Sequence, residues 1–167
     1  AAASEEAPLL PVINSFKPFL STRGVDFTTV RPTAPITKSH LNAIVYHSKP
    51  ELRAAELLDE ADCVEFFAPN EKVELQIPYD YLGVSHYYIP DFLVRIPGNK
   101  TVILEIKGGG GEAHGDDEDK VRQKSAATTK WCSAVNNHGR YGRWDYLICY
   151  ENDIEHLPKL LAEKIDE

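Results

Sequence analysis

The sequence predicts an α/β domain, with a mixed β-sheet of at least four strands and helices on both faces of that sheet. Strand-like runs alternate with helix-like runs in the order helix, three strands, helix, strand, helix. Of the 167 residues, 43% are apolar and 26% are charged, which suits a single core of ordinary size. No apolar run approaches the ~20 residues that a membrane helix needs. The three cysteines form no C-x-x-C pair and no segment is arranged like a signal peptide, so we expect a cytoplasmic protein.

Proline marks the first part of the chain. Of the eleven prolines, several crowd into the first 35 residues, namely Pro8, Pro11, Pro18, Pro32 and Pro35. Proline removes a backbone donor and fixes φ, so such a stretch is typical of an extended connection. We therefore predict a proline-rich N-terminal extension or linker over residues 1–36 and one folded domain over residues 37–167.

The first predicted helix covers residues 48–61. It begins at Ser48-Lys49-Pro50-Glu51, which supplies a capping serine, a proline in the first turn and a glutamate three residues after the cap. Glu51 has two interpretations. It shares a helical face with apolar residues and could be delivered to a site on the sheet, or it completes the capping box with Ser48. Glu56, one turn further along the helix, is a weaker candidate than Glu51 for the acid that reaches a site on the sheet.

Three strands are predicted next, over residues 73–79, 87–96 and 101–107. The tight connection Pro97-Gly98-Asn99 makes residues 87–107 a β-hairpin. A second helix is predicted over residues 117–136, followed by a strand over 144–150 and a closing amphipathic helix over 154–165.

The predicted hairpin carries the residues that indicate chemistry. Asp91 lies on its first strand, and Glu105-Ile106-Lys107 ends its second. Side chains alternate along a strand, so Glu105 and Lys107 share one face while Ile106 takes the other. A three-residue loop at 97–99 pairs Ile96 with Lys100 and sets residue 91 opposite residue 105. A loop of two or four residues would instead set residue 91 opposite 106, and the two carboxylates would face apart unless a bulge corrected the register.

Two carboxylates at roughly 5 Å on one face repel each other, and a divalent cation relieves that repulsion. Hard oxygen ligands beside open positions suit Mg²⁺, with Mn²⁺ as a substitute. Lys107 would orient an attacking water and stabilise charge on a transferring phosphoryl group. The competing interpretation is an exposed strand face with no chemistry, because Pro-Asp and Glu-x-Lys are each common sequences.

Other kinds of site find little support. The histidines have no metal-ligand spacing, and no phosphate-binding loop of the Walker type occurs. Tyrosine and tryptophan at Tyr79, Tyr81, Tyr87, Tyr88 and Trp131 could stack on bases, but aromatic residues in strands and helices usually belong to the core.

The net charge of −8 is unevenly distributed. Acids concentrate in residues 112–119 and 151–167, whereas residues 120–144 contain no acid. The basic residues of that run are either a DNA contact surface or a solvated helix face. We select Lys120, Lys124 and Lys130 as candidate DNA-binding residues. Gly108 to Gly111, before the run, is interpreted as a flexible exit from the strand, with contact to the substrate backbone as the alternative.

Together these motifs resemble a known family. Asp91, Glu105-x-Lys107 and a helical Glu51 resemble the PD-(D/E)xK nuclease superfamily, which has the restriction-endonuclease-like fold. More narrowly, residues 27–150 resemble the C-terminal endonuclease domain of type III-like restriction subunits, whose nuclease is attached to a superfamily 2 helicase motor. The motifs that carry this narrower resemblance are Ile77-Pro78-Tyr79-Asp80-Tyr81, Tyr88-Ile89-Pro90-Asp91-Phe92, Glu105-Ile106-Lys107-Gly108, residues 131–137, Gly142-Arg143-Trp144 and the proline-rich run 27–42.

The resemblance implies roles for individual residues. Asp91 and Glu105 would bind Mg²⁺ with the backbone carbonyl of Ile106, and Lys107 would position the water. Glu51 would complete the site directly or through water. Lys120 and Lys124, one turn apart, would contact the scissile phosphate or its neighbours.

The implied function is Mg²⁺-dependent endonucleolytic cleavage of DNA in a restriction system for phage defence, with DNA and a helicase motor as partners. The alternatives are a catalytically silent module that binds nucleic acid and a domain that docks onto a motor protein. The acidic stretch 112–119 departs from the family pattern, and it would either screen DNA from the metal or remain a solvated loop.

Overall fold

The central element is a four-stranded mixed sheet. A computed structural model describes residues 7–14, 21–108 and 118–166. Within them the sheet has the strand order β3-β6-β7-β8, formed by Phe66–Pro69, Phe92–Ile96, Lys100–Lys107 and Arg143–Tyr150. β6 is antiparallel to both β3 and β7, and β8 runs parallel to β7. The predicted α/β class with a mixed sheet is confirmed.

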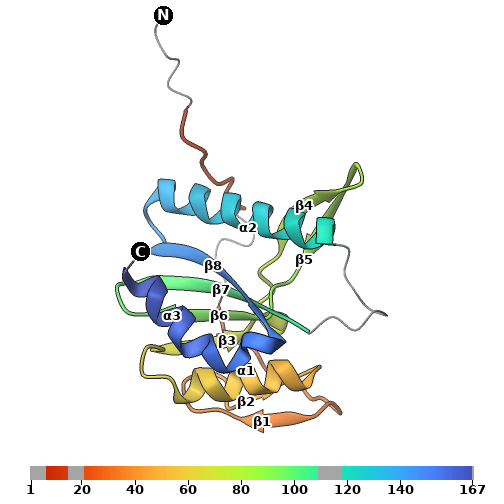
Figure 1. Cartoon of the computed structure of the whole chain (residues 1–167), viewed down its shortest axis with the longest axis vertical. Coiled ribbons are helices and arrows are strands. Elements are labelled where there is room, and N and C mark those ends of the chain that lie inside the picture. Colours follow the sequence, from red (N-terminus) through yellow and green to blue (C-terminus); the bar gives the residue numbers. More distant parts are fainter. Residues whose placement is uncertain (1–6, 15–20, 109–117, 167) are drawn as a thin grey trace, which may run out of the picture.

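Helices cover both faces of this sheet (Figure 1). α1 (Lys49–Glu60) and α3 (Leu157–Asp166) lie on one face, and α2 (Glu118–His138) lies on the other. The alternation along β7 explains this arrangement, because its side chains feed two separate cores. Val102, Leu104 and Ile106 pack with α1 and α3. Ile103 belongs to the smaller core beneath α2.

The helix start at Ser48 follows the predicted capping pattern. The Ser48 hydroxyl accepts a hydrogen bond of 3.3 Å from the Glu51 backbone N–H, and Pro50 stands in the first turn. Ala54, Ala55, Leu57 and Leu58 form the buried face of α1. The predictions for α2, β7 and β8 also hold, with boundaries shifted by one or two residues. The last predicted helix is α3, and residues Glu151–His156 before it form a 3₁₀ helix.

Two strand predictions are wrong in part. Residues Asn70–Lys72 form a 3₁₀ turn and Glu74 has a positive φ of 61°, so the strand predicted over 73–79 begins only at Ile77. The run predicted as one strand over 87–96 is interrupted at Ile89 and Pro90. Proline has no N–H for a ladder, which favours a break there.

The interruption creates a second small sheet. β4 (Ile77–Tyr81) pairs with β5 (Val84–Tyr88) in a separate antiparallel hairpin. In Figure 1 this hairpin, drawn in green, projects from the main sheet beside the first turns of α2. The predicted hairpin over 87–107 is therefore confined to residues 92–107.

Three short strands were not predicted. β1 (Thr33–Pro35) and β2 (Ala43–Val45) pair with each other, and β3 (Phe66–Pro69) pairs with β6. Strands of three or four residues are too short to show periodicity, and β1 and β3 also end in proline, so no strand is predicted from these sequences. None of the helices in the described ranges is long and apolar enough to cross a membrane.

Candidate metal centre

The register of the β6–β7 hairpin matches the prediction. Ile96 pairs with Lys100 and Phe92 pairs with Leu104, across the connection at residues 97–99. One step beyond the last pair, this register sets residue 91 opposite residue 105. The Asp91 carboxylate reaches across to β7, where its Oδ2 accepts a 2.6 Å hydrogen bond from the backbone N–H of Ile106. Two acidic side chains therefore meet at one end of the hairpin.

Glu105 is buried and only partly satisfied. The Lys107 ammonium lies 3.4 Å from Glu105 Oε1, and these side chains are only 17% and 9% exposed. Glu105 Oε2 is buried, and it has no hydrogen-bond partner within the described part of the chain. An unsatisfied buried carboxylate oxygen is costly in a folded protein. That oxygen, beside a second carboxylate, is suited to a cation.

Burial dominates the electrostatics of the pair. Loss of solvent raises the pKa of Asp91 to about 6; the Ile106 N–H opposes this shift and the charge of Glu51 adds to it. Burial and then the Asp91 charge raise the pKa of Glu105 to about 7, while Lys107 and Lys124 act in the opposite direction. Perturbed acids of this kind are frequent at functional sites. A divalent ion would favour the ionised form of both groups.

The Glu51 side chain takes part in the cap of helix α1, as the capping-box interpretation predicts. Its Oε1 accepts a 3.0 Å hydrogen bond from the Ser48 hydroxyl, and its Oε2 accepts one of 2.8 Å from the His47 backbone N–H. Both oxygens are thus engaged at the helix cap. Glu51 still influences Asp91 through its charge, which places the start of α1 beside the centre. Glu56, the weaker substitute, instead pairs with Arg53 at 3.2 Å.

The described residues hold no cluster of three or more His, Cys, Asp and Glu side chains that could ligate a metal. Asp91 and Glu105, with the backbone of Ile106 beside them, are the residues of this centre that could hold an ion. Magnesium keeps several waters and often uses one or two carboxylates together with substrate phosphate oxygens. The donor set thus fits Mg²⁺ better than a metal that demands a complete protein cage.

Aromatic and polar side chains from β5, α2 and β8 surround Glu105. Lys124 Nζ lies 5.4 Å from the centre of the Tyr88 ring, and the Tyr88 hydroxyl hydrogen-bonds to the Thr128 hydroxyl. The Tyr146 hydroxyl lies 3.5 Å from Ser125 Oγ, and Glu105 is near enough to raise the pKa of Tyr146, although burial is the larger cause. These side chains leave the carboxylates a partly desolvated setting.

Tyr146 and Thr128 were not identified from the sequence. Tyr146 pairs with Ile103 in the parallel ladder between β7 and β8, so both residues belong to the face under α2. Strand alternation indicates the face on which Tyr146 lies only when the register of β8 against β7 is known, and that pairing is non-local. Thr128 lies one turn after Lys124 on α2, and that spacing was available in the sequence.

The three candidate DNA-binding lysines are not equivalent. Lys124 lies beside the centre, and its charge lowers the pKa of Glu105. Lys120 is half-buried one turn earlier on the same helix. Lys130 is exposed, and six residues of helix turn it to a different face from Lys124. The structure therefore brings Lys124 to the centre and does not bring Lys130 there.

Gly109 to Gly111 and most of the acidic stretch 112–119 lie outside the described residues. Of that stretch, Glu118 and Asp119 are described as the first residues of α2, and Asp119 pairs with Arg122 at 3.0 Å.

Comparison with known proteins adds no relative: no protein-family model, no curated protein and no solved structure matches the chain. The geometry and chemistry of the centre therefore carry the functional argument.

Proposed function

We propose that this chain is a Mg²⁺-dependent endodeoxyribonuclease domain that hydrolyses phosphodiester bonds in DNA. The observation that carries the proposal is the buried Glu105 Oε2, which lacks a partner next to Asp91 and Lys107. The net cost of a buried carboxylate at Glu105 and a half-buried one at Asp91 beside one amine is high in the absence of a counter-ion. A bound divalent cation removes that cost.

Each residue has a distinct part in the proposed reaction. Asp91 and Glu105 would hold the ion, together with the Ile106 carbonyl oxygen. When bound, the ion supplies Lewis-acid polarisation of a phosphate oxygen and lowers the pKa of a coordinated water. Lys107, held by Glu105 at 3.4 Å, would donate a hydrogen bond that orients the attacking water and would offset charge on the phosphoryl group. The proposed chemistry is an in-line displacement.

The substrate class follows from the surroundings of the centre. Lys124 acts through its charge on Glu105 and Lys120 lies one turn earlier on α2, and positive charge of this kind beside the carboxylates favours the phosphate backbone of a nucleic acid. The resemblance to the PD-(D/E)xK superfamily supports DNA as the substrate. Asp91 directly before β6, Glu105 and Lys107 on β7, and a basic helix next along the chain follow the pattern of that superfamily.

The resemblance to type III-like restriction subunits extends this proposal. It makes the domain part of a restriction system for phage defence in the cytoplasm, with a superfamily 2 helicase motor as partner in the same or an associated chain. Sequence choice would then come from other parts of the assembly.

One observation favours a second function. Glu51, the candidate third acid, spends both carboxylate oxygens on the cap of α1. A catalytically silent domain, which would bind nucleic acid or dock onto a motor protein, could also retain a centre with only two protein carboxylates. Catalysis by the Asp91 and Glu105 pair separates the two functions.

The test is cleavage of supercoiled plasmid DNA with Mg²⁺ or Mn²⁺ against an EDTA control. Asp91→Asn and Lys107→Ala should abolish nicking, whereas Asp62→Asn at an exposed position should leave it unchanged. Titration calorimetry with Mn²⁺ provides a second readout, because Asp91→Asn should also remove metal binding. Equal nicking by the wild-type chain and both site variants would refute catalysis at this centre.

A further inference from the structure

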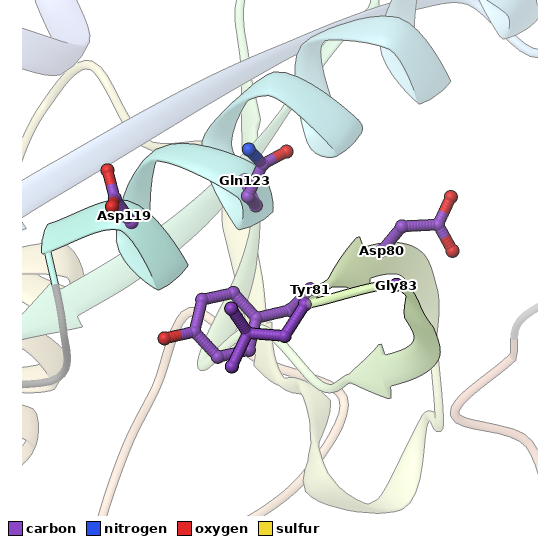
Figure 2. A pocket seen from close by; sticks show the side chains of 6 residues that line it. Asp80, Tyr81, Gly83, Asp119 and Gln123 are labelled. Carbon is purple, nitrogen blue, oxygen red and sulfur yellow. The ribbon is translucent and has the colours of Figure 1, made fainter.

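The hollow at the tip of the β4–β5 hairpin contributes no ligand to the metal centre. It lies between that tip and the first turns of α2 (Figure 2), has a volume of about 440 Å³ and is lined by Asp80, Tyr81, Leu82, Gly83, Asp119 and Gln123. Its two carboxylates have partners of their own, because Asp80 accepts a 2.6 Å hydrogen bond from Ser85 and Asp119 pairs with Arg122. Neither is among the main charges that act on the two acids of the centre. The groups that hold the centre in place lie instead on its buried side.

Asp91 stands just beyond the end of a strand. β5 ends at Tyr88 and β6 begins at Phe92, so residues 89–91 lie in the break between two sheets. The Asp91 carboxylate is held from one side by the Ile106 N–H, at 2.6 Å. A metal ligand must keep its direction, and a residue beyond the end of a strand needs other bonds to fix its peptide planes. The backbone of Asp91 therefore needs a second support.

Asn70 supplies that support. The last residue pair between β3 and β6 is Pro69 with Phe92, and one step further the Asn70 backbone N–H donates a 2.8 Å hydrogen bond to the Asp91 carbonyl oxygen. The Asn70 side chain adds another bond, from Nδ2 to the Pro90 carbonyl oxygen at 3.0 Å. The carbonyl groups on both sides of the Asp91 α-carbon are therefore bonded to one residue.

The arrangement uses both the amide nitrogen and the amide oxygen of Asn70. Its Oδ1 accepts a 2.9 Å hydrogen bond from the Leu75 N–H, and its Nδ2 also donates to the Leu75 carbonyl oxygen at 2.9 Å. Asn70 is 0% exposed, and a buried amide without partners would be costly. Two donors and an acceptor on so short a side chain are available only from asparagine. The bonds to the Asp91 segment thus depend on this residue type.

We propose that Asn70 is a positioning residue for Asp91, which keeps the carboxylate directed at the ion without touching the ion. The inference rests on the metal centre of the function proposed above. Asp91 then stands between two supports, Asn70 on the β3 side and the Ile106 N–H on the β7 side. Removal of an outer contact that holds a metal ligand typically lowers metal affinity by about ten- to a hundredfold.

The first experiment measures the Mn²⁺ affinity of the 167-residue chain by titration calorimetry at pH 8. Asn70→Ser removes the side-chain amide that bonds to Pro90 and Leu75 and leaves the backbone N–H in place. We expect this variant to bind Mn²⁺ about ten-fold more weakly than wild type. Circular dichroism at the same temperature gives the folded fraction, so that the affinity refers to folded chains.

Asn136→Ser is the matched control. The Asn136 amide also ties two elements together, since its Nδ2 donates to the Trp144 carbonyl oxygen at 2.9 Å and its Oδ1 accepts from the Trp144 N–H at 2.7 Å. Trp144 pairs with Thr101, which lies four residues before Glu105 on β7. This variant should lose stability in thermal unfolding and keep the wild-type Mn²⁺ affinity.

Plasmid nicking separates a positioning role from a ligand role. High Mg²⁺ concentration should restore nicking by Asn70→Ser, because both carboxylates are still present and only the affinity is reduced. The same Mg²⁺ concentration should not restore nicking by Asp91→Asn, because that variant lacks a ligand.

A measurement on the wild-type chain tests the inference if Asn70→Ser does not fold. Coupling is reciprocal, so bonds that favour metal binding must themselves be strengthened by the metal. Saturating Mg²⁺ should therefore slow hydrogen exchange of the Asn70 side-chain amide at least about five-fold more than that of the Asn136 amide. Equal slowing of the two amides would overturn the inference.

Unchanged Mn²⁺ affinity in folded Asn70→Ser would also overturn it, as would an equal loss of affinity in Asn136→Ser. Failure of the proposed function has a different signature. A wild-type chain that binds Mn²⁺ but does not nick DNA would refute the nuclease, whereas the affinities of the two variants would still decide the role of Asn70. A wild-type chain that binds no Mn²⁺ would refute the metal centre and the inference together.

Discussion

The carboxylate of Asp91 accepts a 2.6 Å hydrogen bond from the backbone N–H of Ile106, the residue that lies between Glu105 and Lys107. Strand β7 therefore contributes one acid by its side chain and holds the other through its main chain. The two acids keep their relative position as long as the β6–β7 register is kept. Because burial raises the pKa of both carboxyl groups, the charge of the pair depends on pH.

Metal affinity should depend steeply on pH. The pKa values of Asp91 and Glu105 are raised by burial to about 6 and about 7, and the metal binds only the ionised forms. Mn²⁺ affinity measured by calorimetry should therefore fall about ten- to a hundredfold between pH 8 and pH 6, with proton release on binding. An affinity that stays flat over this range would contradict the assignment of these two groups as ligands.

The same burial predicts that Glu105→Gln stabilises the metal-free protein at high pH. The folded pKa of Glu105 is raised from 4.5 to about 7, so its contribution to stability is fully present below 4.5 and is lost as pH rises through 7. In EDTA at pH 8 the variant should gain about 1 to 3 kcal/mol over wild type in urea unfolding. Saturating Mg²⁺ should reverse the order, because only wild type binds it fully. A variant less stable than wild type at pH 8 in EDTA would count against a costly buried charge.

Gly142→Ala should destabilise the fold through the hairpin connection. Gly142 has a φ of 73°, and an added Cβ would lie 2.6 Å from the carbonyl oxygen of Asn99, in the connection that sets the register. We expect a loss of about 2 kcal/mol or more in thermal unfolding. Gly139→Ala is the matched control, because Gly139 has a similar φ of 77° but open space around it. Equal losses in the two variants would show that backbone strain alone is responsible.

Ser48→Ala should lower the free energy of unfolding by about 1 kcal/mol. The Ser48 hydroxyl accepts from the Glu51 N–H and donates to the Glu51 carboxylate, so both hydrogen bonds of this hydroxyl are lost. Ser133→Ala provides the comparison on α2, where the hydroxyl donates to a backbone carbonyl on an exposed face and little change is expected. Urea unfolding of both variants checks this difference; similar values would show that the cap carries no special weight.

The centre was accessible to sequence reasoning because its geometry is local. Strand alternation joins Glu105 to Lys107, and the connection Pro97-Gly98-Asn99 determines which residue faces Asp91. Glu51 was left open between two roles, and the hydrogen bonds of the cap decide its contacts. The role of Glu51 depends on where the start of α1 lies against the sheet, and no local sequence pattern predicts that position.

The remaining differences also have physical causes. Tyr87 to Ile96 is a nearly continuous apolar and aromatic run, and its periodicity conceals the break at Pro90 that assigns β5 and β6 to different sheets. Tyr146 lies at the site because β8 pairs in parallel with β7, although the whole of α2 separates these two strands in the sequence. Lys130 was grouped with Lys124 by charge, whereas helical phase separates them.

The break at Ile89 and Pro90 has a consequence for how such a domain can diversify. The arm formed by β4 and β5 shares no ladder hydrogen bond with the strands that fix Asp91 and Glu105, so residues at its end are released from the constraints on the acids. Selection can therefore change the length or the chemistry of the β4–β5 hairpin while Asp91 and Glu105 stay as they are.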